Sequence, residues 1–322
     1  VEATLGWAFE LDVDALRLDA VKHMDHVITR TLSLTLQARS EARGGAPFWL
    51  VGETFTGDEG RDLIMSYVSE SELDGQFDFP LLGAIRSTFG GDGSFRDLEA
   101  ATAASEQAYG AATDLMSPFV GNHDVPRIAT VIAGNDGGPW GETADLMAAG
   151  SADVIDQWEI INRMSLSYAY LLGLRGVPLL YYGDEIGLAG AIDPDNRRTM
   201  VFAPDLNANQ QLLLSRVQQL GQIRAGSLAL RRGLRKELWL DDVLYVFARY
   251  TDAGDVAIVA MSKATTSRTE QVTLPPELGL ADGTVLNSAN SSRTMTVTGG
   301  QISLTLDPWE YMVVVHPSDP SD

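Results

Sequence analysis

The 322-residue chain contains no cysteine and only four histidines. A disulfide framework is therefore excluded, and few side chains remain for a zinc site. Basic residues are also scarce, because 23 Lys and Arg stand against 44 Asp and Glu and give a net charge of −21. An electrostatic field of that sign repels nucleic acid and anionic membrane surfaces, so we expect neither as a partner.

Long apolar runs and targeting segments are missing as well. No apolar run approaches the ~20 residues that a membrane-spanning helix needs, and no basic-then-apolar signal segment follows Val1. The chain opens instead in what resembles a helix around Leu5, Ala8 and Phe9. The lack of cysteine fits several compartments; we expect a secreted or periplasmic bacterial protein and leave a cytoplasmic one open.

Hydrophobic residues make up 45% of the chain, which is enough for one large core and a smaller domain. Up to Gly233, apolar runs typical of buried strands alternate with helical periodicity, and this pattern favours a parallel α/β architecture. Strands are expected at 15–19, 47–53, 77–81, 115–120 and 177–182, helices at about 21–43, 61–68, 95–109, 158–174 and 207–224, and a loop at 134–156.

Strand–helix alternation stops after Gly233. Short runs of alternating polarity follow, separated by Gly and Asp turns, and they predict a small antiparallel sandwich. We expect a parallel α/β domain over 1–233, an all-β domain over 234–316 and a disordered tail over 317–322. The expected sandwich strands are 243–250, 256–261, 270–274, 294–297, 301–306 and 310–315.

Charged groups follow the expected strands of the first domain. Asp19 ends the first strand, and period-two alternation places it on the same side as Arg17, whose guanidinium can keep it ionised. An equally simple interpretation is that Asp19 caps the next helix. The strand-end groups are Asp19, Glu53, the cluster Asn122-His123-Asp124, and Asp184-Glu185.

Acids that meet at the carboxyl ends of parallel strands suit glycoside hydrolysis. That reaction needs one ionised carboxylate as nucleophile and one protonated carboxyl as acid, about 5–5.5 Å apart when configuration is retained. The other use of converging acids is a Mg²⁺ site for phosphoryl transfer. No Gly-rich phosphate loop followed by Lys supports that use.

Four motifs carry a family resemblance. Asp14-Ala-Leu-Arg-Leu-Asp-Ala-Val-Lys-His23 resembles the nucleophile motif of the α-amylase superfamily, glycoside hydrolase family 13, and Val51-Gly-Glu-Thr-Phe-Thr-Gly-Asp58 resembles its acid/base motif. Phe119-Val-Gly-Asn-His-Asp124 resembles the third motif of the family, apart from Gly121, where many members carry a polar residue. Gly176-Val-Pro-Leu-Leu-Tyr-Tyr-Gly-Asp-Glu185, with Asp193-Pro-Asp-Asn-Arg197, resembles the eighth-strand motif and its sugar-binding loop.

The resemblance implies part of a (β/α)₈ TIM barrel, strands 4 to 8, followed by a β-sandwich. It implies a retaining hydrolase of α-1,4-glucosidic bonds in starch or maltodextrins. Asp19 would be the nucleophile and Glu53 the acid/base, and Asp124 would stabilise the transition state. The implied substrate-binding residues are Arg17, Lys22, His23, His123, Asp193 and Arg197.

The resemblance also concerns cofactors, and other roles for some of the residues and other functions for the protein stay open. No cofactor is needed for the chemistry, but the backbone carbonyl of His23 would be a ligand of a structural calcium. His123 could instead be a buried structural histidine, and Lys22 and Arg197 could be ordinary solvated charges. A cyclomaltodextrinase, a neopullulanase-like enzyme or a transglycosylase would use the same motifs. A non-catalytic carbohydrate-binding protein would have the same fold, although such a protein typically loses one of the three acids.

Five expected strands are fewer than the eight of a closed barrel. In the resemblance, 15–19 is the fourth strand. The partner expected for these residues is therefore an N-terminal part of the barrel, present as a cleaved segment, a separate chain or omitted residues.

Overall fold

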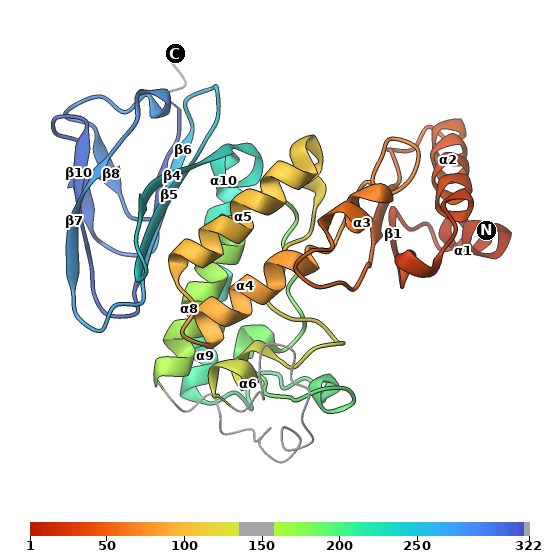
Figure 1. The fold of residues 1–322 in the computed structure, drawn as a ribbon, viewed down its shortest axis with the longest axis horizontal. Helices are drawn as coiled ribbons and strands as arrows, with labels where there is room; N and C mark the ends of the chain where they lie inside the picture. Colours follow the sequence, from red (N-terminus) through yellow and green to blue (C-terminus); the bar gives the residue numbers. More distant parts are fainter. Residues whose placement is uncertain (135–157, 319–322) are drawn as a thin grey trace. The chain divides into compact units, whose positions relative to one another are not determined.

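The computed structural model describes residues 1–134 and 158–318. The predicted loop at 134–156 and most of the predicted tail at 317–322 lie outside this part of the chain. The chain divides into two compact units, which are described separately. Unit 1 comprises Val1–Gly83 with Ala101–Phe119, and unit 2 comprises Ala84–Ala100 with Val120–Asp322 (Figure 1).

Unit 1 is built on a small parallel sheet. Its strand order is β1-β2-β3, and Ala15 pairs with Trp49 to set the register of the first two strands. The apolar cluster around Leu36, Leu50 and Leu73 packs the helices onto this sheet. The elements are α1 (Glu2–Glu10), β1 (Ala15–Leu18), η1 (Val21–His23), α2 (His26–Ala42), β2 (Trp49–Gly52), α3 (Arg61–Ser66), β3 (Gly75–Gln76) and η2 (Gly110–Leu115).

Burial differs between the two longer strands of unit 1. The prediction that 47–53 is buried is confirmed, since Leu50, Val51 and Gly52 are buried. The prediction that 15–19 is a buried strand is wrong, because only Leu18 of β1 is buried. β1 is at the edge of the sheet and has one neighbouring strand among the described residues, so its side chains lie open.

Three other predicted strands are wrong. Residues 77–81 begin a helix instead, because the Asp78 carboxylate accepts the Leu81 N–H at 3.1 Å and Pro80 suits a first helical turn. Residues 115–120 form no regular strand either, although Ser117 makes a bridge to Phe77 and Phe119 is also a bridge residue. Residues 177–182, all of them described, form no regular strand. A strand needs a neighbour for its backbone groups, and an apolar run alone does not supply one.

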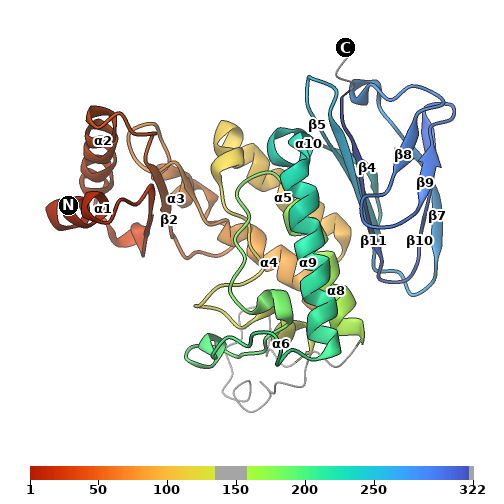
Figure 2. The same cartoon turned by 180° about the vertical axis from the view of Figure 1, so that it is seen from behind.

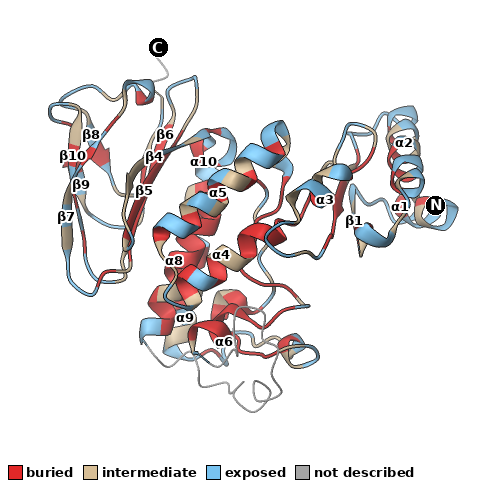
Figure 3. Ribbon diagram, viewed as in Figure 1, coloured by how far each residue is buried: buried red, intermediate tan, exposed pale blue. Residues whose placement is uncertain are grey.

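Unit 2 contains a helical part, in which α8 (Trp158–Gly173) is buried along nearly its whole length (Figure 3). It lies beside α9 (Ala208–Gly226) and also packs on β6 and β11 (Figure 2). Its ends and those of α9 agree with the sequence prediction within two residues. The remaining helices are α6 (Ile128–Ile132) and α10 (Leu228–Arg232), with α4 (Phe79–Gly90) and α5 (Phe95–Tyr109) running across the division between the units.

Antiparallel strands complete unit 2. A four-stranded sheet of order β11-β6-β5-β4 faces the pairs β10-β7 and β8-β9 across one apolar core (Figure 1). Leu234 begins the first of these strands, and the boundary of 1–233 with 234–316 stays a prediction. The strands are β4 (Leu234–Leu240), β5 (Leu244–Tyr250), β6 (Val256–Ser262), β7 (Arg268–Thr273), β8 (Val285–Asn287), β9 (Thr294–Thr296), β10 (Gln301–Leu306) and β11 (Tyr311–His316).

In the described part of the chain, no helix has both the length and the apolar character needed to cross a bilayer.

Candidate active site

In unit 1, two of the predicted carboxylates come from adjacent parallel strands. The Glu53 N–H donates to the Leu18 carbonyl at 2.8 Å, so the sheet register places Glu53 beside the end of β1. The Oε2 atom of Glu53 accepts the Ala20 N–H at 2.8 Å, and Ala20 directly follows Asp19. Glu53 is buried, whereas the Asp19 side chain is 73% exposed. The buried carboxylate therefore lies against the backbone that carries the exposed one.

Arg17 and Asp19 form an ion pair, with the guanidinium Nη1 2.5 Å from Oδ1 of the carboxylate. This contact is the one that period-two alternation predicts. The Arg17 guanidinium also lies 5.7 Å from the centre of the Phe77 ring. Contacts on two sides limit the rotamers of Arg17, and Asp19 gains a fixed hydrogen-bond donor.

Two backbone features bring the strand ends together. Ala20 has φ 47° and ψ 42°, a left-handed conformation that is uncommon for a residue with a side chain. This turn aims its N–H at Glu53. At Gly52, an added Cβ would lie 2.4 Å from Cδ1 of the buried Leu73 side chain, so a larger residue would require that side chain to shift. Backbone strain of this kind is concentrated at functional sites.

Lys22 and His23 follow on η1. The Lys22 ammonium donates to the Phe55 carbonyl at 2.7 Å and lies 5.9 Å from the centre of the Phe55 ring. Lys22 is thus bound to the loop after β2, in contrast to a freely solvated charge. His23 is exposed. Their roles toward substrate stay predictions.

Unit 2 brings four other predicted residues together. The Asn122 side chain accepts the Asp124 N–H at 2.9 Å and fixes a tight turn there. His123 Nε2 lies 3.4 Å from an Asp124 oxygen, and an Arg197 Nη2 lies 3.5 Å from the other oxygen. Arg197 Nε lies 3.2 Å from Asp193 Oδ1. These four side chains are all partly exposed, so the cluster can contact a ligand.

Asp184 is different from the other strand-end acids. It is fully buried and paired with Arg127 at 2.8 Å, in a segment that forms a short 3₁₀ turn. Burial raises the pKa of Asp184 to about 6, although the Arg127 charge and hydrogen bond act in the opposite direction. The expectation that Asp184 ends a strand as a group fit for chemistry is wrong. Gly121 lies against this carboxylate, where an added Cβ would be 3.2 Å from Oδ2.

Arg127 and Asn196 are positioning residues that the sequence analysis missed. Arg127 donates to the carbonyls of Tyr182 and Asn196 as well as to Asp184. The Asn196 amide donates to the carbonyls of His123 and Val125, both at 2.9 Å. The two side chains thus connect the Asn-His-Asp turn to the loop that carries Asp193 and Arg197. Asn196 lies inside the motif at 193–197, and Arg127 follows the motif at 119–124 by three residues. These positions were the only signal, because an apolar or periodic pattern does not reveal buried polar contacts.

The metal prediction was tested against the donors present. Among the described residues, no group of three or more His, Asp or Glu side chains is arranged to hold a metal ion. The His23 carbonyl alone does not make a calcium site. The described residues therefore do not fit the calcium site that the resemblance implies.

Known proteins resemble this chain along nearly its full length. The sequence model of the family described as alpha amylase, catalytic domain, matches residues 2–216. A beta/alpha-amylase of Paenibacillus polymyxa is 30% identical over 306 residues, which are 94% of this chain and 22% of the relative. A cyclomaltodextrin glucanotransferase of Klebsiella oxytoca is 26% identical over 339 residues, covering 98% of this chain and 48% of that one. The crystal structure of an Anoxybacillus α-amylase matches with a TM-score of 0.79 at 24% identity, over 99% of this chain and 62% of its own.

Parallel strands in unit 1 end in two adjacent carboxylates, and unit 2 has a separate Asp–His–Arg cluster; acids at the ends of parallel strands are typical of the α/β-barrel class. The chain belongs to the α-amylase family. The predicted fold class, part of a (β/α)₈ TIM barrel followed by an antiparallel β domain, is confirmed. The chain spans only 22% and 48% of the length of the two curated relatives above.

Proposed function

We propose that the protein is a retaining glycoside hydrolase that cleaves α-1,4-glucosidic bonds in starch or maltodextrins. Asp19 is the nucleophile, and Glu53 is the acid/base. The observation that carries the proposal is the hydrogen bond from Ala20 N–H to Glu53 Oε2, which holds the two carboxylates to adjacent strand ends. Because starch cannot cross a cell envelope, action on starch requires export to the medium, whereas action on maltodextrins also suits the periplasm or the cytoplasm.

Each residue has a defined role in this proposal. Asp19 attacks the anomeric carbon and forms a glycosyl ester, while Glu53 donates its proton to the leaving oxygen. Glu53 then removes a proton from the water that hydrolyses the ester, which restores both carboxyl groups. Arg17, within 2.5 Å of Asp19, orients the nucleophile.

The remaining predicted residues bind the sugar. Asp124 and His123 hold ring hydroxyls as the ring flattens in the transition state. Arg197 contacts both Asp124 and Asp193 and so gives these two carboxylates a common cation. Lys22 and His23 bind sugars on the leaving-group side.

A transglycosylase is the second candidate. A cyclomaltodextrin glucanotransferase is among the relatives, and transfer uses the same glycosyl ester with a sugar hydroxyl in place of water. Product analysis on maltooligosaccharides separates the two, because transfer gives products longer than the substrate, and hydrolysis gives only shorter ones.

Replacement of Glu53 by Gln tests the proposal. Glu53→Gln is expected to lower turnover on soluble starch by at least ~10³-fold, the scale of losing a general acid. The fold should be unchanged, because the amide oxygen of Gln can still accept the Ala20 N–H. Reducing-sugar release should be measured in the longest form of the protein that its gene encodes.

Glu70→Gln, an exposed acid in the same unit, is the matched control and should behave as the wild type. More than a tenth of wild-type activity in Glu53→Gln would show that the acid is another residue.

A further inference from the structure

Unit 2 contains a pocket of about 320 Å³ that none of the predicted catalytic or substrate-binding residues lines. Helices α8 and α9 form one wall of it. The loop between β8 and β9 and the turn between β10 and β11 form the other. Its lining includes two tryptophans and several polar side chains: Trp158, Trp309, Arg216, Gln219, Asn290 and Glu310.

A second pocket of about 620 Å³ adjoins the first. Trp158, Asn162 and Trp309 line both of them, so the two indole rings stand at the junction of one continuous hollow. We call this pair of pockets the two-tryptophan hollow. Trp158 is 63% exposed, which is unusual for the largest apolar side chain.

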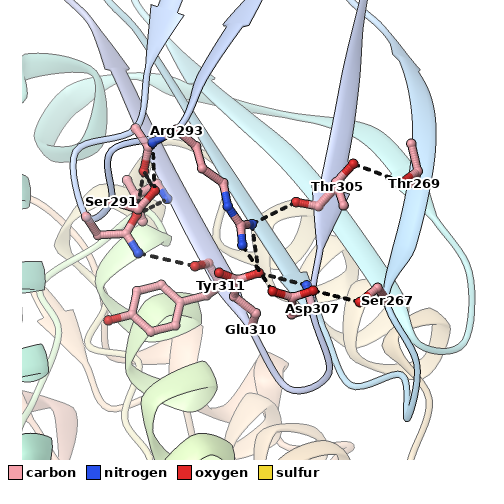
Figure 4. A network of polar contacts seen from close by, with 11 residues as sticks. Ser267, Thr269, Ser291, Arg293, Thr305, Asp307, Glu310 and Tyr311 are labelled. Carbon is pink, nitrogen blue, oxygen red and sulfur yellow. Dashed lines mark hydrogen bonds and ion pairs between the residues drawn. The ribbon is translucent and has the colours of Figure 1, made fainter.

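Trp309 has a left-handed backbone with φ 54°. A bulky residue in this conformation is a genuine outlier and persists only where the surroundings enforce it. Here an arginine braces the turn from one side: Arg293 donates to the Thr305 carbonyl at 2.9 Å and pairs with Glu310 at 2.8 Å and with Asp307 at 3.2 Å (Figure 4). These contacts therefore fix the backbone conformation of the turn and, with it, the position of Trp309.

Both rings are also held by cations. The Arg163 guanidinium lies 4.5 Å from the centre of the Trp309 ring and is itself paired with Glu159 at 2.7 Å. The Arg216 guanidinium lies 5.5 Å from the centre of the Trp158 ring and donates to the Asn162 side chain at 2.9 Å. A cation–π contact of this kind occupies one face of the indole and fixes its orientation, so a ligand would stack on the opposite face. The rings are thus fixed before any ligand arrives, which reduces the entropy cost of binding.

The charges and polar groups that line the two-tryptophan hollow indicate which kind of ligand it can bind. In the first pocket Arg216 is opposed by the carboxylates of Asp307 and Glu310. In the second, Arg163 and Lys263 are balanced by Asp92 and Glu159, so neither pocket offers an anionic ligand a net positive charge. The net charge of −21 disfavours an anion further. Indole faces suit a ligand with apolar C–H faces, and the surrounding amides, hydroxyls and carboxylates suit one that carries many hydroxyl groups. A neutral sugar chain has both properties.

We propose that the two-tryptophan hollow is a second, non-catalytic binding site for an α-glucan chain, with sugar rings stacked on Trp158 and Trp309. The choice of an α-glucan rests on the proposed function, whereas the choice of a neutral saccharide rests on the hollow itself. Such a site holds the polymer on the protein independently of catalysis, and this raises the local substrate concentration.

Affinity electrophoresis through amylopectin tests the site. The longest native form of the protein should carry Glu53→Gln, so that the polymer stays intact during the run. Trp158→Ala in this background is expected to weaken retardation by amylopectin, with the apparent dissociation constant rising about tenfold. Phe202→Ala, an equally exposed aromatic of unit 2 that lines neither pocket, is the matched control and should not change retardation. Trp309→Leu should give the same loss as Trp158→Ala, with melting temperatures recorded for every variant.

Activity measurements separate the possible failures. With Glu53 intact, Trp158→Ala should hydrolyse a short maltooligosaccharide within twofold of the wild-type rate. Unchanged retardation of Trp158→Ala, in a protein that hydrolyses starch, overturns the second site and leaves the proposed function standing. A parallel loss of turnover on the short substrate overturns the second site as well, because Trp158 would then belong to the catalytic cleft. A parent protein that neither hydrolyses nor binds α-glucan overturns both proposals.

Discussion

Glu53 and Asp184 are both buried acids in family motifs, but their partners give them different roles. Glu53 accepts a backbone N–H from Ala20. Asp184 is paired with Arg127, which also holds two carbonyls. Removing one member of a buried ion pair leaves an uncompensated charge, so this pair stabilises the loops around the Asp124 cluster without itself meeting substrate.

The titration of Asp184 gives a prediction about stability. Its pKa is about 6 in the folded chain and 3.8 without the fold. A raised pKa means that the contribution to stability is fully present below pH 3.8 and is lost as the pH rises through about 6. The free energy of unfolding of the wild type should thus fall, relative to that of Asp184→Asn, by about 2 kcal/mol between pH 4 and pH 7.

Urea unfolding of the wild type and of Asp184→Asn from pH 4 to pH 7 measures the difference between their free energies of unfolding at each pH. Because Asn cannot titrate, other groups contribute equally to both curves and cancel. Two curves that run parallel from pH 4 to pH 7 would show that Asp184 is not the group that titrates.

At the scale of elements, periodicity predicted the helices well and the strands of unit 1 less well. Helices α5, α8 and α9 bury one face or more against the core, and this leaves a period in the sequence that marks their ends. Whether an apolar run becomes a strand depends on a neighbour that the run itself does not encode. Residues 177–182 are apolar like β2, yet they form no regular strand among the described residues.

In the candidate site, too, some residues were proposed from sequence motifs, and others are identified only by the contacts that they make in the folded protein. Asp19, Glu53 and Asp124 were proposed from the sequence because each belongs to a motif with a fixed order of residue types. Arg127 and Asn196 were not, because their importance lies in the carbonyls they bind, and those are brought near only by folding.

The close approach of β3 to η2 provides the element-scale prediction. A Cβ added at Gly75 would lie 2.0 Å from the Leu115 carbonyl oxygen, and a backbone atom cannot move aside as a side chain can. Gly75→Ala should therefore lower the free energy of unfolding by about 1–3 kcal/mol or more. Gly57→Ala is the matched control, since nothing lies within 4 Å of its added Cβ, and it should stay within about 0.5 kcal/mol of the wild type. Equal unfolding midpoints for the two variants would contradict the described packing of β3.

On the scale of the whole molecule, unit 1 leaves apolar surface open. β1 is an edge strand in the described sheet, and Trp7, Leu11 and Val27 are each at least 60% exposed. An unpaired edge with exposed apolar side chains promotes association between copies. The partner we propose for this surface is the N-terminal part of the barrel.

Residues 1–322 produced alone should therefore self-associate, despite a net charge of −21 that opposes it. Light scattering during gel filtration measures this. Addition of a segment that supplies the N-terminal barrel strands should restore a monomer with activity on starch. A monomeric 1–322 that hydrolyses starch at an ordinary rate would contradict the proposed partner.

The central claim is that Asp19 forms the covalent bond to sugar. A slowly turned-over fluorinated glucosyl substrate should trap the glycosyl ester on the enzyme, and mass spectrometry of the digested protein locates it. The account predicts a mass increase of one glycosyl group on the peptide that contains Asp19, and none in Asp19→Asn. A trapped sugar on a peptide without Asp19 would contradict the account.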